Sequence, residues 1–389
     1  MHSLRSFLIL SLLLAALSTP AQQPRILDLT SPDGATLKAS FFPAAKLGPG
    51  LLLLHQCNRQ RKVWDDLAQK FAASGINVLT FDFRGFGESA GPPFDKLSND
   101  QIQDLFDKKF PLDVDTAYKF LASQPSVTPT VMAAGGASCG VNQAVLLASR
   151  HPEVKALVLL SEATFRPGRE FLRKNPNLPL FAAVADDDPD PAVVEFMEWI
   201  YSFSTNPINK FEHFPKGGHG VELFALHKDL PTEIVTWLTN ALSPFPAIPA
   251  TRAPALAEHQ NHFLNLLDDP ANIPNAPQLF AEAHQRYPKE VIFSEPVLNR
   301  LGYEYLQSGN NPAAIALFKL NVTAYPDSPN VYDSLADAYI ATGQKDLARQ
   351  NEQKTLDLLA HYTKYSEAES KALREAAQKK LTQLSSPPH

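Results

Sequence analysis

The chain has 389 residues, of which 44% are hydrophobic and 20% are charged, and its formal net charge at pH 7 is −6. This ordinary apolar content excludes a disordered chain, and the lack of a basic excess argues against a nucleic-acid-binding protein. Because only 2 cysteines are present, a disulfide-framework fold and a four-cysteine zinc site are excluded as well. The length suggests two or three folded units.

Residues 1–21 have the pattern of a secretory signal peptide. Arg5 gives a basic start, residues 7–17 form an apolar run, and small residues follow as far as Ala21. The run is shorter than the roughly 20 apolar residues that span a bilayer, so a permanent anchor is the weaker interpretation. We therefore expect an exported protein, periplasmic or secreted, with no membrane attachment once the signal is removed.

Residues 22–242 alternate between short apolar runs and segments with helical spacing. Strands are expected at residues 25–30, 37–42, 51–54, 76–81, 131–134, 156–160, 180–185 and 210–214. Helices are expected around residues 64–71, 114–121, 142–150 and 235–238. The turn sequence SPDG at residues 31–34 indicates an antiparallel hairpin for the first two strands. The alternation as a whole favours an α/β domain whose mostly parallel sheet is flanked by helices.

A proline-rich linker, residues 243–256, separates this domain from an all-helical region. Four of the 33 prolines of the chain fall within residues 243–254, which favours an extended segment. We therefore place the domain boundary here.

Residues 257–384 contain an internal repeat, whose period of about 34 residues is that of a tetratricopeptide repeat. The matched pairs are Leu298 and Tyr332, Leu301 and Leu335, Gly302 and Ala336, Tyr305 and Tyr339, Gly309 and Gly343, and Ala314 and Ala348. The region therefore resembles a tetratricopeptide array, which implies an all-α domain. Such a domain binds an extended peptide or protein partner, or packs against the first domain.

The sharpest chemical signal is GASCG at residues 136–140, which follows an expected strand and precedes an expected helix. In this context the G-x-S-x-G pattern is typical of a nucleophile on a tight strand-to-helix turn, where only small neighbours fit. The N-terminus of the helix then favours developing negative charge. A nucleophilic serine also needs a base and an orienting acid. Candidates follow in the order acid then histidine, in DDDP at residues 186–189 and GGHG at residues 217–220.

Together with LH at residues 54–55 and DFRGFGES at residues 82–89, these motifs make the chain resemble the α/β-hydrolase superfamily over residues 25–242. Within it, the chain resembles dienelactone hydrolase or esterase-like enzymes and serine aminopeptidases. The resemblance implies Ser138 as the nucleophile, Asp188 as the acid with Asp187 in reserve, and His219 as the general base. His213 and His227 fall in an expected strand and helix, where structural or surface roles are favoured.

The same resemblance implies an oxyanion hole made of the backbone amides of Cys57 and Cys139. The sequence departs from the superfamily at Gln56, where glycine is common; the Gln56 side-chain amide is a further candidate donor. His55 is interpreted as structural. Cys139 is an alternative nucleophile, but centring the turn on it would place Val141 where a small residue is required.

Neither a metal nor a cofactor is expected. Asp186, Asp188 and Asp190 have the spacing of a calcium loop, but Pro191 and Met197 replace the glycine and glutamate that such a loop needs. The segment between positions 160 and 179 is too short for a substantial cap over the site. The site is therefore expected to be open or covered by the second domain, an arrangement that suits soluble esters better than lipid interfaces.

We therefore expect an exported serine hydrolase whose substrate is a small acyl compound, such as an ester or a lactone. A serine peptidase is the alternative within enzymes, and an inactive hydrolase-like scaffold whose repeats bind a partner is the alternative outside them. In an oxidising compartment Cys57 and Cys139 could form a disulfide that ties the two oxyanion loops together. The alternative is two small thiols packed beside the site.

Overall fold

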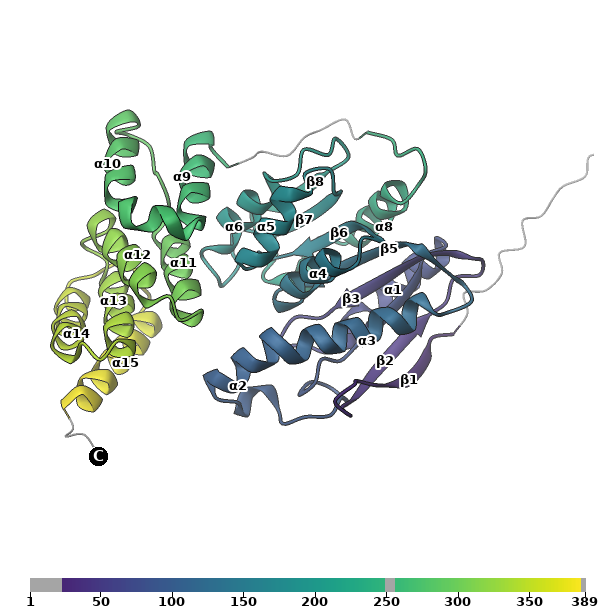
Figure 1. Cartoon of the computed structure of the whole chain (residues 1–389), viewed down its shortest axis with the longest axis horizontal. Coiled ribbons are helices and arrows are strands. Elements are labelled where there is room, and N and C mark those ends of the chain that lie inside the picture. Colours follow the sequence, from purple (N-terminus) through teal and green to yellow (C-terminus); the bar gives the residue numbers. More distant parts are fainter. Residues whose placement is uncertain (1–22, 249–255, 386–389) are drawn as a thin grey trace, which may run out of the picture.

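The computed structural model describes residues 23–248 and 256–385, which form a sheet domain followed by a helical domain (Figure 1). The expected signal peptide, residues 1–21, lies outside the described residues, as do residues 249–255 of the expected linker. Within the described ranges, no helix combines the length and apolar character needed to cross a membrane.

A single sheet forms the centre of the first domain, with eight strands among the described residues in the order β1-β2-β4-β3-β5-β6-β7-β8. The strands are β1 (Arg25–Thr30), β2 (Thr36–Phe42), β3 (Gly48–Leu54), β4 (Asn77–Phe81), β5 (Val127–Ala137), β6 (Val154–Leu160), β7 (Leu180–Ala185) and β8 (Lys210–Phe214). The pairs β1–β2 and β2–β4 are antiparallel, and all other neighbours are parallel. The prediction of a mostly parallel α/β sheet is confirmed.

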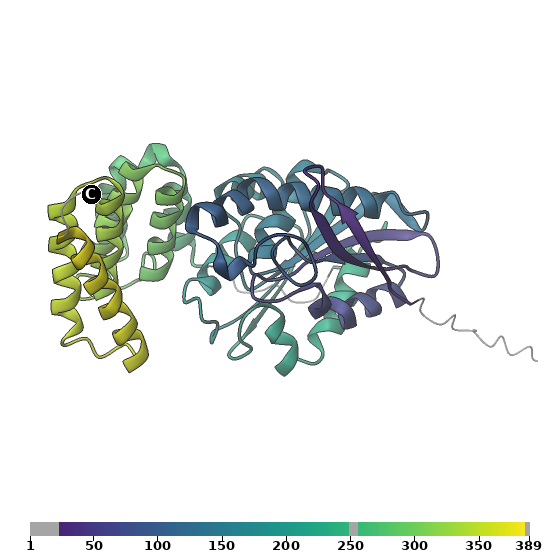
Figure 2. The same cartoon turned by 90° about the horizontal axis from the view of Figure 1, so that it is seen from below.

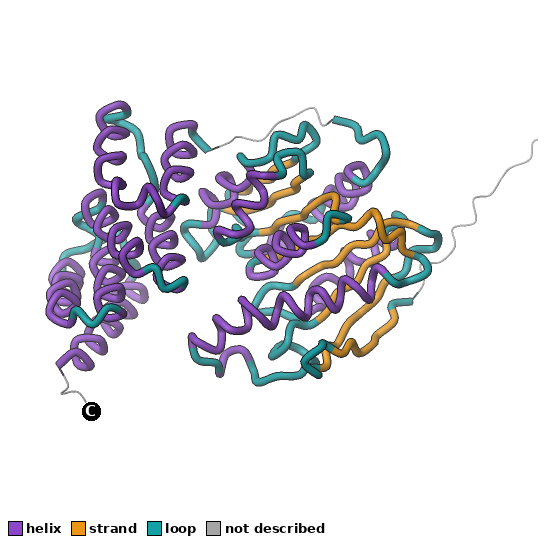
Figure 3. Tube along the Cα trace, viewed as in Figure 1, coloured by secondary structure: helices purple, strands orange, loops and turns teal. Residues whose placement is uncertain are grey.

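The apolar run of β3 is buried on both faces of the sheet. Leu51 and Leu53 pack into one core, Leu52 and Leu54 pack into the other, and none of the four side chains is exposed. Helices cover both faces (Figure 3). The covering helices are α1 (Asp65–Ala73) and α8 (Leu230–Ala241) on the Leu51 face, and α3 (Phe110–Ala122), α4 (Cys139–Arg150) and α6 (Val193–Tyr201) on the Leu52 face. A parallel sheet needs this double cover.

The sequence analysis missed several helical segments of this domain. Among them are α2 (Asn99–Asp104) with the π-helical segment η3 (Leu105–Lys109), α5 (Arg166–Lys174), α6 and the short α7 (Leu223–Leu226). Ser98 and Gln101 form a capping box at the start of α2, so local polar chemistry rather than apolar spacing defines that helix. Between β6 and β7, a stretch that is described throughout, the chain forms only the short α5 and no inserted cap.

The second domain is all helical in the described residues. Its helices are α9 (Glu258–Asp268), α10 (Ala276–Arg286), α11 (Glu295–Gln307), α12 (Asn311–Ala324), α13 (Pro329–Ala341), α14 (Lys345–Leu359) and α15 (Glu367–Ser385), with a 3-10 segment η5 (Pro270–Asn275) between α9 and α10. α11 contacts α12, and α13 contacts α14. α11 and α13 start at Glu295 and Pro329, and α12 and α14 start at Asn311 and Lys345, so both pairs keep the period of the sequence repeat.

A glycine sets the distance between α11 and α12. A Cβ atom at Gly302 would lie 2.5 Å from the Phe318 ring, so this position of the repeat tolerates no side chain while Phe318 stays in place. Ala336, its counterpart in the following repeat, is fully buried. Gly302 and Ala336 are therefore packing positions, whereas Gly309 and Gly343 have positive φ in open space and serve the turns after their helices.

The two domains contact each other through α5 and α6 on one side and α9 and α11 on the other. The helical domain lies at one end of the sheet domain in both views (Figure 1 and Figure 2). The guanidinium of Arg169, with 1% of its side chain exposed, lies 2.6 Å from Asp268 and 2.8 Å from Glu304. Trp199 adds a hydrogen bond from its indole nitrogen to Asn265. Removing one partner of a buried ion pair destabilises a protein by about 3–5 kcal/mol, because the other charge is left buried and unpaired. These contacts therefore define how the two domains dock.

Candidate active site

Ser138 lies in the tight turn between β5 and α4. Its φ of 51° is in the left-handed region, which costs energy for a residue other than glycine. A Cβ at Gly136 would collide with the carbonyl of Gly140, and a Cβ at Gly140 would collide with the carbonyl of Leu54. Glycine is thus required on both sides, because the turn folds tightly on itself and against the end of β3.

His219 and Asp188 form the neighbouring pair. The Nδ1 atom of His219 lies 2.8 Å from Oδ2 and 3.0 Å from Oδ1 of Asp188, whose side chain is 1% exposed. Asp187 instead accepts hydrogen bonds from the amides of Gly217 and Gly218, so it shapes the loop that carries the histidine. Asp188 rather than Asp187 is therefore the carboxylate that contacts His219.

The loop of His219 rests on the turn of Ser138. A Cβ at Gly220, where φ is 62°, would lie 3.3 Å from the Cβ of Ala137, the residue before the serine. The amide of Val221 donates to Oε1 of Gln56 at 2.9 Å, which fastens the same loop to the segment after β3. Chain segments after β3, β5, β7 and β8 thus converge at one edge of the sheet.

The surroundings of His219 favour its protonated form. Burial lowers the pKa, but the hydrogen bond and the charge of Asp188, together with the charges of Glu162 and Glu222, outweigh burial and raise the pKa above 6.5. The His219 side chain is 19% exposed to solvent, so a substrate can reach the ring. A histidine in this setting can accept a proton from a neighbouring hydroxyl and then hold the positive charge.

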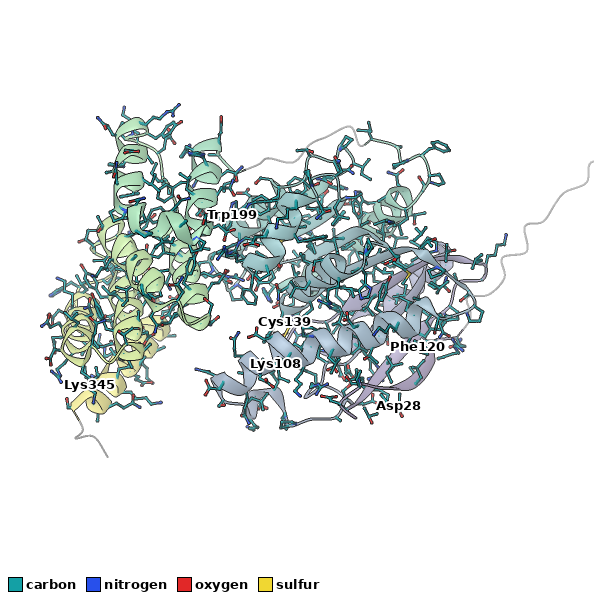
Figure 4. All side chains as sticks on the ribbon, in the orientation of Figure 1. Asp28, Lys108, Phe120, Cys139, Trp199 and Lys345 are labelled. Carbon is teal, nitrogen blue, oxygen red and sulfur yellow. A yellow bond between two sulfur atoms is a disulfide. The ribbon has the colours of Figure 1, made fainter. Side chains whose placement is uncertain are left out.

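Cys57 and Cys139 are joined by a disulfide, with their Cα atoms 5.8 Å apart. The bond links the segment after β3 to the first residue of α4, and Figure 4 shows Cys139 on the side of the sheet domain that faces the helical domain. A bonded sulfur is not a nucleophile, which argues against the alternative that Cys139 attacks the substrate. Among the described residues, neither cysteine amide donates a backbone hydrogen bond, as an oxyanion hole requires.

His55 and Gln56 have supporting positions beside the site. The Nε2 atom of His55 accepts a hydrogen bond from the Phe83 amide, and its Nδ1 lies 2.8 Å from the carbonyl of Gln56. Burial lowers the pKa of His55 to about 4, so the ring is neutral and braces two loops. The Gln56 side chain donates to Asn58 and accepts from Val221, which makes it a tie between loops rather than a free donor.

The DFRGFGES segment at residues 82–89 also supports the fold. Asp82 accepts hydrogen bonds from the backbone amides of Arg61 and Glu88 and forms a buried ion pair with the Arg61 guanidinium. Gly87 has a φ of 52°, and a Cβ there would collide with the Asp82 carboxylate. This motif, one of those on which the resemblance to α/β-hydrolases rests, therefore fixes a loop.

The sequence analysis missed three residues at this edge. Ser161, directly after β6, has a φ of 48° and a buried hydroxyl without a hydrogen-bond partner among the described residues. Glu162 follows it and acts electrostatically on His219. Arg300, from α11 of the helical domain, contacts both Glu162 and Asp190. Positive φ at a serine and contacts between domains leave no pattern in a single sequence.

The three aspartates whose spacing resembles a calcium loop, an interpretation that the sequence analysis rejected, have protein partners. Asp186 lies 2.6 Å from His213, Asp188 contacts His219, and Asp190 lies 2.9 Å from Arg300. In the described part of the chain, no group of three or more His, Cys, Asp or Glu residues is arranged to hold a metal ion.

Residues 50–185 match the protein-family model described as serine aminopeptidase, S33. Among curated proteins, the thiohydrolase aneE of Aspergillus aculeatus is 28% identical over 181 residues, which are 43% of this chain and 54% of the relative. The polyketide transferase grgF of a Penicillium species is 28% identical over 147 residues, which are 36% of this chain and 47% of the relative. The chain thus spans about half the length of these curated relatives.

Solved structures align with somewhat more than half of the chain. The Pyrococcus furiosus esterase Pf2001 gives a TM-score of 0.47 at 17% identity over 57% of this chain and 93% of its own. The α/β hydrolase GrgF from Penicillium sp. sh18 gives 0.45 at 17% identity over 57% of this chain and 99% of its own. The sheet order, the turn at Ser138 and the family match over residues 50–185 together support placing the first domain in the α/β-hydrolase superfamily.

Proposed function

We propose that this chain is an exported serine hydrolase that cleaves a carboxylic ester, a lactone or a related acyl bond. The observation that carries the proposal is the strained turn of Ser138, with the His219–Asp188 pair on the loop that rests against it. The match to a serine aminopeptidase family and the thiohydrolase among the relatives support the hydrolase class.

The geometry supports a two-step acyl transfer. The Ser138 hydroxyl attacks the carbonyl carbon while His219 accepts its proton, and Asp188 holds the Nδ1–H so that Nε2 is the basic atom. The amides of Cys57 and Cys139 stabilise the oxyanion. His219 returns the proton to the leaving group, and water, activated by His219, then releases the acid from the acyl-enzyme.

A fluorophosphonate probe tests the nucleophile directly. We expect covalent labelling of the wild type, loss of labelling in Ser138→Ala, and unchanged labelling in Ser149→Ala, an exposed serine of the following helix. Intact mass and peptide mapping would locate the adduct. A folded wild type that takes up no probe would refute the enzyme and favour the inactive scaffold.

Two further bond types are candidates because the similar proteins suggest them. A thioester is suggested by the thiohydrolase relative, and a peptide bond by the aminopeptidase family. Rates with p-nitrophenyl acetate, an acetyl thioester and an aminoacyl anilide would rank the three. We expect the ester and thioester to exceed the anilide by at least tenfold, because an amine is the poorer leaving group.

The location and the helical domain complete the proposal. The Cys57–Cys139 disulfide supports an exported protein, because disulfides persist in oxidising compartments. The helix starts that recur with the period of the sequence repeat support a tetratricopeptide-like array over α11–α14. One edge of this array packs on the sheet domain. A peptide or protein partner for its remaining surface stays a prediction.

A further inference from the structure

A cavity of 870 Å³ lies between the two domains. The sheet domain contributes Phe106 of η3, Leu146 of α4 and Phe165, while the helical domain contributes Glu304 and Gln307 of α11. Its volume is in the upper part of the ~300–1,000 Å³ range of pockets that hold drug-sized ligands. An acetyl group would occupy only a small part of this volume.

One wall of the cavity is formed by the helix that starts directly after Ser138. Asn142, which lines it, lies about one helical turn beyond Ser138 along α4. Its side-chain oxygen accepts hydrogen bonds from the Thr164 hydroxyl at 2.7 Å and from the Phe165 amide at 3.1 Å, which fixes the Phe165 backbone at the cavity. On the opposite side, Gln143 donates to the carbonyl of Phe106 and holds η3 beside α4.

The helix that closes the cavity also touches the catalytic edge. Arg300 of α11 contacts Glu162 and Asp190, which follow the carboxyl ends of β6 and β7. Glu304, one turn further along α11, lines the cavity. One helix of the second domain therefore spans from the segments around Asp188 and His219 to the cavity wall.

The lining suits an amphipathic chain. Phe106, Leu146 and Phe165 supply apolar surface. Charged and polar side chains line the cavity from both domains: Asp107, Arg166 and Glu170 from the sheet domain, and Glu304 and Gln307 from α11. Building on the proposed function, we propose that this cavity receives the acyl chain of the substrate, with room for a chain much longer than acetyl, and that α11 forms one of its walls. The helical domain thus completes the substrate site in a protein whose sheet domain has only the short α5 between β6 and β7.

The test compares p-nitrophenyl decanoate with p-nitrophenyl acetate in the full chain. Leu146→Trp fills the cavity from the sheet domain, and Gln307→Trp fills it from the exposed end of α11, where folding is least disturbed. Lys345→Trp is the matched control, because this residue is exposed on α14, on the side of the helical domain away from the sheet domain (Figure 4). We expect the wild type to prefer decanoate. We expect the decanoate-to-acetate ratio of kcat/KM to fall at least tenfold in both cavity variants and to stay unchanged in the control.

Two results would overturn the inference in distinguishable ways. If acetate is hydrolysed but Gln307→Trp keeps the wild-type ratio, α11 is not a wall of the substrate site, and the proposed hydrolase stands without it. If neither ester is hydrolysed and Ser138 takes up no fluorophosphonate, the proposed function fails and this inference fails with it. Thermal unfolding of each variant would establish that the rates come from folded protein.

Discussion

At the scale of single residues, the environment of His219 predicts the pH dependence of the reaction. The ring must be neutral to accept the Ser138 proton, and its pKa is raised above 6.5 mainly by Asp188, against the effect of burial. We therefore expect kcat/KM for p-nitrophenyl acetate to rise with pH and to reach half its maximum above pH 6.5. A pH–rate profile of the free enzyme measures this value directly.

Replacing the acid checks the assignment of Asp188. Asp188→Asn removes the charge that raises the pKa and no longer holds the correct tautomer, so we expect kcat to fall about 10³- to 10⁴-fold. Asp186→Asn is the matched control because Asp186 contacts His213 instead, and we expect its rate to stay within threefold of the wild type. Equal losses in the two variants would contradict the assignment.

At the scale of secondary-structure elements, the disulfide joins the segment after β3 to the start of α4 across 82 sequence positions. Closing a loop of that length removes entropy from the unfolded chain, so the double variant Cys57→Ser/Cys139→Ser should lose about 4–5 kcal/mol of unfolding free energy. The amides of Cys57 and Cys139, which we propose as the oxyanion hole, would also lose their fixed spacing, and we expect kcat/KM to fall about ten- to a hundredfold. Urea unfolding and ester hydrolysis measure the two effects. A loss of stability below about 1 kcal/mol would contradict the first.

The elements that could be predicted are those whose apolar residues form a continuous run or a regular spacing. The β3 leucines are buried on both faces, as a continuous apolar run predicts, and the strand ranges of β1, β7 and β8 agree with the structure to the residue. α2 and α5 are polar and lack such a pattern, so the sequence analysis missed them. It also missed α6, although Val193, Phe196 and Ile200 of that helix are buried at helical spacing. At the site, short motifs pointed to Ser138, Asp188 and His219. Glu162 and Arg300 depend on how the two domains meet, which no local pattern encodes.

At the scale of the whole molecule, the domain interface is charged as well as apolar. Arg169 is held between Asp268 and Glu304, and Arg173 also contacts Asp268. Asp268 keeps a lowered pKa despite burial, because the two guanidinium groups outweigh the loss of solvent. Separating the domains would leave these buried charges without partners. The ion pairs therefore hold the helical domain beside the edge of the sheet where Ser138, Asp188 and His219 lie.

This docking predicts that Arg300, a residue of the helical domain, alters the pKa of His219, the proposed general base. Arg300 offsets the charges of Glu162 and Asp190, and the amide of Asp190 donates to Asp188 at 3.0 Å. Arg300→Gln removes a positive charge near Glu162, so the pKa of His219 should rise and the acid limb of the kcat/KM profile should move to higher pH. Glu162→Gln should move it down, and Arg300→Lys, which keeps the charge, should stay near the wild type. Loosened packing alone would lower the rate without shifting the acid limb of the pH profile. If the acid limb of Arg300→Gln stays where it is in the wild type, Arg300 has only a structural role.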